Sequence, residues 1–221
     1  MEKMPYQPDL EPMLPPAAAL PTPSTVTSDW RTGLPTLMGS RVSLRELRAS
    51  DAPALFAALS SEQVAKFISP PPATVEGFGR FIQWAIRQRQ VGQYVCFAVV
   101  PHGSATAVGI FQVRSLEPAF GTAEWGFALA AEFWGTGLFV DGARLVIDFA
   151  FDVLGTHRLE ARAALRNGRG NGALQKLGAV QEGVLRRSFL RNGEYLDQAL
   201  WTILQDEWMQ AKTVWGSPVI H

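Results

Sequence analysis

A short segment near the middle of the chain, Thr122–Leu129, alternates between bulky residues and small or polar ones. Successive side chains of a strand point to opposite faces, so this alternation predicts a strand with two different faces. The face expected to lie on the core carries Trp125, Phe127 and Leu129. The opposite face carries Glu124, Gly126 and Ala128. A carboxylate beside small residues leaves room for a ligand on this second face.

The strand leads through a glycine-containing loop, Trp134–Gly137, into a long apolar segment, Leu138–Leu154. The strongly polar residues of that segment form one narrow stripe, which consists of Asp141, Arg144, Asp148 and Asp152. This pattern predicts a helix that is buried on most of its circumference and is stopped by Gly155. Backbone N–H groups at the start of a helix attract anions such as phosphate. The loop is a candidate phosphate site, although an ordinary turn explains its two glycines equally well.

The pattern before this region predicts a strand, two helices and a hairpin. Residues Arg41–Arg45 alternate like a half-buried strand, and Ser50–Asp51 is expected to cap a short helix. The apolar face of that helix is Ala52, Leu55, Phe56 and Leu59. Thr74 is expected to cap a second helix, whose buried stripe is Phe78, Phe81, Ile82, Ala85 and Ile86. The apolar runs Tyr94–Val100 and Ala107–Val113 then predict a hairpin.

The pattern after the long helix predicts a crossover and a final hairpin. Arg158–Ala163 is expected to be a strand, and the glycine-rich run Asn167–Gly172 leads into a short helix. Two more strands, Ala179–Leu190 and Tyr195–Leu204, flank Asn192-Gly193, which is a strong type I′ turn signal. This order of elements predicts one mixed α/β domain.

The chain divides into three parts. Residues 1–33 carry seven of the 15 prolines, with small residues between them, and are expected to be a disordered leader. Residues 34–210 are expected to form the folded domain, and residues 211–221 a C-terminal tail. The pattern does not indicate what the leader does.

Composition narrows the function classes. The formal net charge of the 221 residues is zero, so no basic field favours nucleic acid. No apolar run reaches the length of a membrane span, and the chain does not begin like a secretion signal. The single cysteine, Cys96, lies within an apolar run and is expected to be a buried thiol rather than a nucleophile. We therefore expect a cytoplasmic protein without disulfides, and no cluster of Cys and His predicts a metal.

Five blocks of sequence together resemble one protein family. They are WGTG at 134–137, RLEARAALRN at 158–167, LQKLGA at 174–179, EGVLRRS at 182–188 and NGEYLDQALW at 192–201. In this order they resemble the RimJ/RimL-like branch of the GNAT N-acetyltransferase superfamily, over about Leu37 to Trp208. The resemblance implies a single domain with a mixed, mostly antiparallel sheet that is splayed at its middle and flanked by helices. Acetyl-CoA, as co-substrate, would lie in the opening.

The resemblance also implies which residues bind the co-substrate. The pyrophosphate would lie on backbone N–H groups of Trp134, Gly135, Thr136, Gly137 and Leu138. The pantetheine arm would pair with the strand at Phe127, Ala128 and Leu129, and further contacts would come from Asn167 and Lys176. Gly170 stands where relatives carry a serine that is thought to protonate the departing thiolate, so the general acid is undefined.

The resemblance points to Glu124 as the catalytic base, acting through water, because an amine must lose a proton before it attacks. Two other roles for Glu124 are equally open, namely binding of the substrate ammonium and pairing with an arginine. Backbone N–H groups near Phe127–Leu129 would stabilise the oxyanion. Asp141 is expected to cap its helix, and Asp197 to pair with Arg186 or Arg187. His157 is expected to be a turn residue.

The leading hypothesis is an acetyl-CoA-dependent N-acetyltransferase that moves an acetyl group directly to a primary amine in a ternary complex. The alternatives are a non-catalytic acyl-CoA-binding sensor or interaction module, suggested by Gly170 and the proline-rich leader, and a nucleotide-binding protein. Relatives acetylate protein N-termini, amino acids, polyamines and drugs, and the sequence does not select among these acceptors. Their specificity should depend on Phe67–Gln90 and Phe189–Leu196. A homodimer is also left open.

Overall fold

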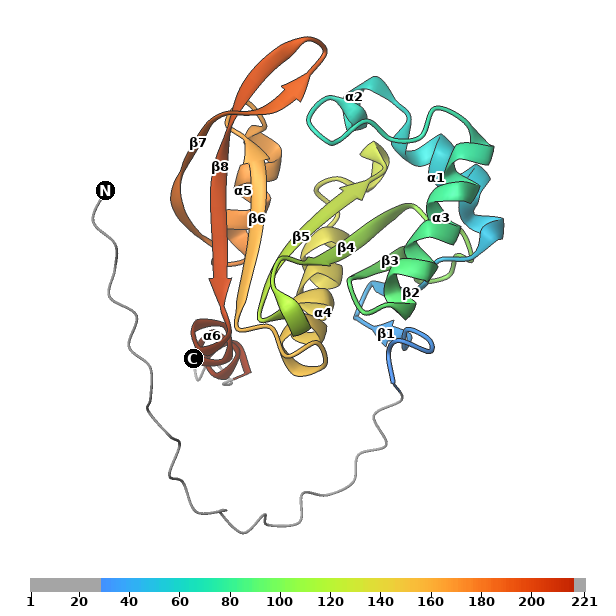
Figure 1. Cartoon of the computed structure of the whole chain (residues 1–221). Helices are drawn as coiled ribbons and strands as arrows, with labels where there is room; N and C mark the ends of the chain where they lie inside the picture. The colour runs from blue at the N-terminus through green and yellow to red at the C-terminus, as the bar shows by residue number, and fades with distance from the viewer. Residues whose placement is uncertain (1–28, 217–221) are drawn as a thin grey trace, which may run out of the picture.

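The structure, a computed structural model, describes residues 29–216 (Figure 1). Its sheet has eight strands in the order β1-β2-β3-β4-β5-β6-β8-β7. The strands are β1 (Leu37–Met38), β2 (Val42–Glu46), β3 (Tyr94–Pro101), β4 (Gly109–Ser115), β5 (Thr122–Leu129), β6 (Arg158–Ala164), β7 (Val180–Arg191) and β8 (Glu194–Leu204). The helices are α1 (Ala52–Leu59), α2 (Glu62–Ala65), α3 (Val75–Gln90), α4 (Leu138–Asp152), α5 (Gly168–Lys176) and α6 (Gln205–Gly216). This confirms the predicted mixed α/β domain.

The sheet opens between its two middle strands. Every neighbouring pair is antiparallel except β5 and β6, which run parallel. These two strands pair over only three positions, of which Glu124↔Glu160 is the last. Beyond it β5 continues beside β4, and β6 beside β8, so that the strands diverge (Figure 1). The mostly antiparallel sheet splayed at its middle is therefore confirmed.

Helices cover both faces of the sheet. Helices α1 and α3 pack on one face, and α4 packs on the other, against β2 and β4. Strand β3 alternates between the two: Val95, Phe97 and Val99 belong to the core on the α4 side, whereas Cys96 and Ala98 belong to the core under α3. Burial on both faces explains why this strand is a continuous apolar run in the sequence.

Strand β5 has the two faces that its alternation predicts. Trp125 and Leu129 are buried in the core on the α4 side, and Phe127 packs against this core with its ring 4.5 Å from that of Phe139 in α4. Ala128 contributes to the core on the opposite side. Glu124 and Gly126 are half-buried on that same side.

Both predicted cap residues stand at the start of their helices, but only one of them makes the capping hydrogen bond. Thr74 precedes α3, and its Oγ1 accepts a hydrogen bond from the Gly77 N–H at 3.0 Å, as predicted. Asp51 precedes α1, but its side chain makes no cap hydrogen bond. The carboxylate instead accepts from both terminal nitrogens of Arg45, at 2.7 and 2.8 Å. The predicted position of the cap is therefore confirmed, but the carboxylate binds Arg45 and the Arg48 N–H rather than an N–H group of α1.

The last hairpin has the predicted turn. Asn192 and Gly193 both have positive φ, 50° and 78°, as a type I′ turn requires. Strand β7 is less regular than predicted, with shifts of register at Gln181/Gly183 and Leu185/Phe189. In Figure 1 the hairpin bends over toward α2. Arg191 near its tip donates a hydrogen bond to the Ala65 carbonyl of α2 at 2.8 Å.

The domain includes residues that the sequence places in the proline-rich leader. Trp30 is only 7% exposed, and its ring meets that of Phe120 edge-on at 5.6 Å. The buried guanidinium of Arg89 donates to the carbonyls of Trp30 and Arg31. Residues 1–28 of the leader, and residues 217–221 of the tail, lie outside the described residues. Helix α6 extends beyond the predicted domain end at residue 210.

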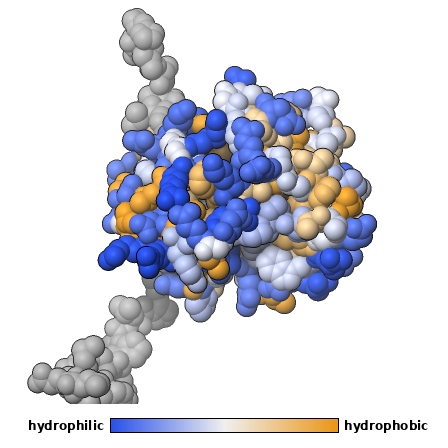
Figure 2. Space-filling view, turned by 90° about the horizontal axis from the view of Figure 1, so that it is seen from above, coloured by the Kyte–Doolittle hydropathy of each residue, from blue (hydrophilic) through white to orange (hydrophobic). Residues whose placement is uncertain are grey.

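None of the helices within residues 29–216 is long and apolar enough to cross a membrane. Viewed from above, hydrophobic residues form separate groups among hydrophilic ones (Figure 2). This face therefore presents a mixed surface rather than one continuous apolar patch.

Candidate active site

A cavity of about 700 Å³ lies where β5 and β6 separate. One side is formed by β5 residues 124–128, and the other by β6 residues 161–163 together with the start of α5. The connection between α2 and α3 and Phe189 of the final hairpin also line the cavity, together with residues of α1, α3, β3, β4 and β8. The connection and Phe189 belong to the two regions that the sequence assigns to acceptor specificity. The cavity therefore connects the open edges of the sheet with the two segments that are predicted to select the acceptor.

The free edge of β5 faces this cavity. The Ala130 N–H donates to Val108 O on the β4 side at 2.9 Å. Because backbone groups of a strand alternate in direction, those of Phe127 and Leu129 point away from β4, toward the opening. The Leu129 carbonyl already accepts from Trp134 Nε1 at 3.0 Å. The Phe127 backbone is thus the best placed of the three predicted pantetheine contacts, with Ala128 pointing to β4.

The loop Trp134–Gly137 has the backbone shape of an anion site. Gly135 and Gly137 have positive φ, 76° and 85°, which only glycine adopts readily. Thr136 Oγ1 donates to the Phe133 carbonyl at 2.8 Å and holds the loop closed. The first N–H groups of α4, from Leu138 onward, have no partner within the helix. Trp134 contributes in a different way, because its ring lies under the Arg169 guanidinium at 4.4 Å.

Asp141, in the first turn of α4, does not cap its own helix as predicted. Its carboxylate accepts from the Arg41 N–H at 2.7 Å, from the Ser40 N–H at 3.1 Å and from Ser40 Oγ at 3.0 Å. Partial burial alone would raise the pKa of Asp141, but these hydrogen bonds outweigh it and lower the pKa. Asp141 therefore ties the turn before β2 to the candidate phosphate loop.

Asn167 lies at the start of α5 and lines the cavity. Its Oδ1 caps the helix by accepting from the Gly170 N–H at 2.9 Å. A Cβ atom at Gly170 would lie 2.5 Å from Asn167 Nδ2, so a serine there would force the asparagine to move. Lys176 is exposed in the last turn of α5, at the opposite end of the helix from Asn167, and does not line the cavity. Its contact with the co-substrate stays a prediction.

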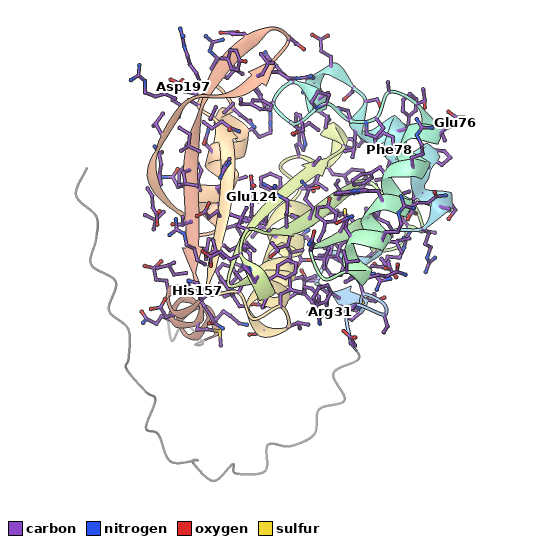
Figure 3. All side chains as sticks on the ribbon, viewed as in Figure 1. Arg31, Glu76, Phe78, Glu124, His157 and Asp197 are labelled. Carbon is purple, nitrogen blue, oxygen red and sulfur yellow. The ribbon has the colours of Figure 1, made fainter. Side chains whose placement is uncertain are left out.

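Glu124 lies at the fork between β5 and β6, facing the cavity (Figure 3). Its Oε2 is 2.5 Å from a terminal nitrogen of Arg114, and its Oε1 is 3.9 Å from Nε of Arg162. Arginine pairing, one of the two other roles left open for Glu124, is thus present in the structure. Its role as a base stays a prediction.

Four cavity residues were missed in the sequence. Arg114 and Arg162 flank Glu124 from the strands on either side, and Tyr94 donates from its hydroxyl to Gln112 Oε1 at 2.5 Å nearby. Burial raises the pKa of Tyr94 well above its usual value. The alternation of side chains along β3, β4 and β6 could have pointed to these residues, because they share one face of the sheet with Glu124. Strand register, which the sequence does not specify, is needed to align them.

Several conspicuous residues lie elsewhere. His157 lies just before β6, beside α6, and Asp197 lies in β8 of the final hairpin (Figure 3). The Asp197 carboxylate accepts from the backbone N–H of Arg187 at 2.7 Å, rather than from a guanidinium. Cys96 is buried, as predicted. Within the part of the chain that the structure describes, no three His, Cys, Asp or Glu side chains gather into a metal site.

The fold and this cavity can now be compared with known proteins. The model of the acetyltransferase (GNAT) domain family matches residues 41–180, which span β2 to the start of β7. The chain belongs to the GNAT acetyltransferase family. The match includes Glu124, the candidate phosphate loop and Asn167. The predicted superfamily is thereby confirmed.

Individual relatives cover most of the domain. The uncharacterized N-acetyltransferase p20 of Bacillus licheniformis is 26% identical over 174 residues, which is 78% of this chain and 98% of that protein. A GCN5-related N-acetyltransferase from Brucella melitensis has a TM-score of 0.70 and 27% identity, and the match covers 83% of this chain and 86% of that one. RimJ of Mycobacterium smegmatis, solved with CoA-disulfide, has a TM-score of 0.69 at 22% identity, over 75% and 83% of the two chains. At that identity RimJ shares the fold.

Proposed function

We propose that this GNAT protein transfers the acetyl group of acetyl-CoA to a primary amine by direct attack in a ternary complex. The observation that carries the proposal is the separation of β5 and β6 immediately after Glu124↔Glu160, which leaves an unpaired strand edge beside a carboxylate. An acyl donor can pair with that edge from one side while an amine approaches Glu124 from the other.

The residues present fit acetyl-CoA along its length. The N–H groups at the start of α4, which lack partners within the helix, together with Gly135 and Gly137 in the left-handed conformation, suit the pyrophosphate, although the Leu138 N–H also makes a long hydrogen bond of 3.4 Å to Thr136 Oγ1. The free edge at Phe127 suits the amides of the pantetheine arm, and Asn167 Nδ2 is a donor on the facing wall, since only Oδ1 is used by the cap. Donors for the pyrophosphate and for the pantetheine arm are therefore available, although residues 134–138 do not line the cavity itself.

In the proposed reaction the amine nitrogen bonds to the carbonyl carbon of the acetyl group, and the carbon–sulfur bond breaks. The nitrogen gives its proton, through water, to the Glu124 carboxylate, and the electron pair of the broken bond leaves on sulfur. No side-chain hydroxyl at Gly170 is available to protonate that sulfur. A thiol with a pKa of about 8.5 leaves readily as thiolate near neutral pH, so solvent can supply the proton.

The decisive experiment measures thiol release from acetyl-CoA with an amine panel, together with acetyl-CoA binding by calorimetry. Glu124→Gln should lower kcat at pH 7 by on the order of 10²-fold, because it removes a proton acceptor. Its acetyl-CoA affinity should change by less than about threefold, since Glu124 does not lie on the phosphate loop. Glu207→Gln, exposed on α6 and outside the cavity lining, is the matched control and should retain wild-type kcat.

Two results would contradict the proposal in different ways. Full activity of Glu124→Gln between pH 6 and 9 would remove Glu124 as the base while leaving acetyl transfer intact. Tight acetyl-CoA binding with no turnover of any amine would instead favour the non-catalytic sensor, for which the missing hydroxyl at Gly170 is the relevant observation.

A further inference from the structure

The charged groups of the cavity are unusual for a site that receives an amine. The lining contains two guanidinium groups, Arg114 and Arg162, and a single carboxylate, Glu124. Both arginines line the cavity beside Glu124. The side chain of Arg114 is 57% exposed and that of Arg162 is 38% exposed. A ligand entering the cavity therefore meets net positive charge, which repels a polycation and attracts an anionic group.

Arg162 has the most unused binding capacity. It donates no hydrogen bond to any residue in the described part of the chain, and its ion pairs are long, 3.9 Å to Glu124 and 4.0 Å to Glu160. Glu160 is occupied more closely by Arg158, at 2.9 Å. A guanidinium carries five N–H donors in a planar fork that matches a carboxylate. Arg162 is therefore free to bind a carboxylate of the ligand at the cavity wall.

The short distance between Arg162 and Glu124 limits which ligand could use both. An amine held at Glu124 and a carboxylate held at Arg162 must lie within a few ångströms of one another, because the two protein groups are 3.9 Å apart. The two groups are that close when they are attached to the same carbon atom.

Most of the remainder of the acceptor side of the cavity is apolar, apart from Ser69, Tyr94, Gln112 and Gln198. It is lined by Leu59, Phe67, Ile68, Phe78, Phe81 and Phe189. Apolar and aromatic side chains of a ligand would be removed from water against these residues, which favours binding by roughly 25 cal/mol per Å² buried.

We propose that the acceptor is an α-amino acid with an apolar or aromatic side chain. Its amine lies at Glu124, its carboxylate pairs with the Arg162 guanidinium, with Arg114 adding positive charge, and its side chain lies among the phenylalanines. This inference rests on the proposed function, since it names the substrate class of the same site. The proposed acceptor differs from polyamines and protein N-termini, on which some relatives act, because no carboxylate lies next to the amine in those substrates.

The test compares L-phenylalanine with L-phenylalaninamide, which has the same amine and side chain but no carboxylate, and with spermidine. The full chain is incubated with acetyl-CoA and each amine, and thiol release gives kcat/KM. The wild type should prefer the acid, and Arg162→Gln should lower the ratio of acid to amide by at least about tenfold, as expected for a lost charged hydrogen bond. The change of ratio is the readout, because the different basicities of the two amines cancel between variants.

Arg186→Gln is the matched control, since Arg186 is exposed on β7, lies outside both predicted specificity segments and does not line the cavity; it should leave the ratio at the wild-type value. Equal loss of both activities in Arg162→Gln, or a wild-type preference for the amide or spermidine, would overturn the inference while acetyl transfer stands. Bound acetyl-CoA with no thiol release from these amines or from a peptide with a free N-terminus would overturn the proposed function itself.

Discussion

The Cys96 thiol illustrates how position on a strand decides reactivity. Its side chain is buried under α3, and burial raises its pKa to about 12, although the neighbouring Tyr94 hydroxyl acts in the opposite direction. At pH 8 the thiolate is then about 10⁻⁴ of the total. We expect no reaction with a thiol reagent in the native protein and reaction of one thiol after denaturation. Rapid labelling at pH 8 without denaturant would contradict this burial. The same inertness keeps the thiol-release assay free of background.

Asp141 shows what a residue's position in the sequence leaves undetermined. An acidic residue in the first turn of a helix predicts a favourable interaction with its own N-terminus. Its carboxylate instead binds Ser40 and Arg41, 100 residues earlier in the chain. Gly39 is part of this contact, because a Cβ atom there would lie 2.4 Å from Asp141 Oδ2. Nothing local marks such a partner, since it depends on how α4 packs against β2.

The edge strand β7 is held to β6 across β8 by a bidentate ion pair. Arg158 donates to both carboxylate oxygens of Glu182, at 2.6 and 2.9 Å, and Thr202 donates to the same carboxylate at 2.8 Å. The hydrogen bonds from Arg158, and then from Thr202, lower the pKa of Glu182 to about 2. A carboxyl whose pKa is lower in the folded state stabilises the protein at pH values above its pKa in the unfolded state, which is about 4.3. This contribution is lost as the pH falls toward the folded-state pKa of about 2.

Glu182→Gln should therefore lower the free energy of unfolding by about 1 kcal/mol at pH 7, a figure reduced for the partial exposure of the pair. The difference from wild type should shrink steadily between about pH 4.5 and 2. Urea unfolding at pH 7, 4 and 2.5 measures it. Glu194→Gln, in the same hairpin, removes an exposed pair with Arg166 and should cost less than about 0.5 kcal/mol. A Glu182→Gln difference that does not vary with pH would contradict this account.

Elements with strong local signals were predicted well. Strand β5, the stripe of α3 and the turn Asn192-Gly193 follow from alternation, helical spacing and backbone preference. Helix α2 has only four residues, too few for a periodic pattern, and α6 has a weak separation of polar and apolar residues, so neither was predicted. The register shifts of β7 depend on pairing with β8 and leave no mark in β7 alone.

The arrangement of the whole molecule was predicted from the family resemblance more than from the pattern of hydrophobic and polar residues. Alternation placed Glu124 on an open face, but the fork between β5 and β6 is a property of two strands more than 30 residues apart. The same distance separates Glu124 from Arg162, so the pairing that defines the acceptor side was not visible. The loop and the start of α4 after Gly137 were predicted correctly because the glycines and the helix start are local signals, whereas phosphate binding at the loop stays a prediction.

Trp30 marks where the folded domain begins and gives a prediction for the whole chain. Its indole is buried against Phe120, and Arg89 binds the adjoining carbonyls, although the sequence places Trp30 in a proline-rich leader. Truncation of a buried tryptophan costs about 3 kcal/mol or more, which in a domain of this size lowers Tm by roughly 6–12 °C. Trp30→Ala should show this loss by calorimetry. Trp30 does not line the cavity, so thiol release below the new Tm should persist. A Trp30→Ala variant as stable as wild type would place the start of the domain after residue 33, where the sequence predicts it.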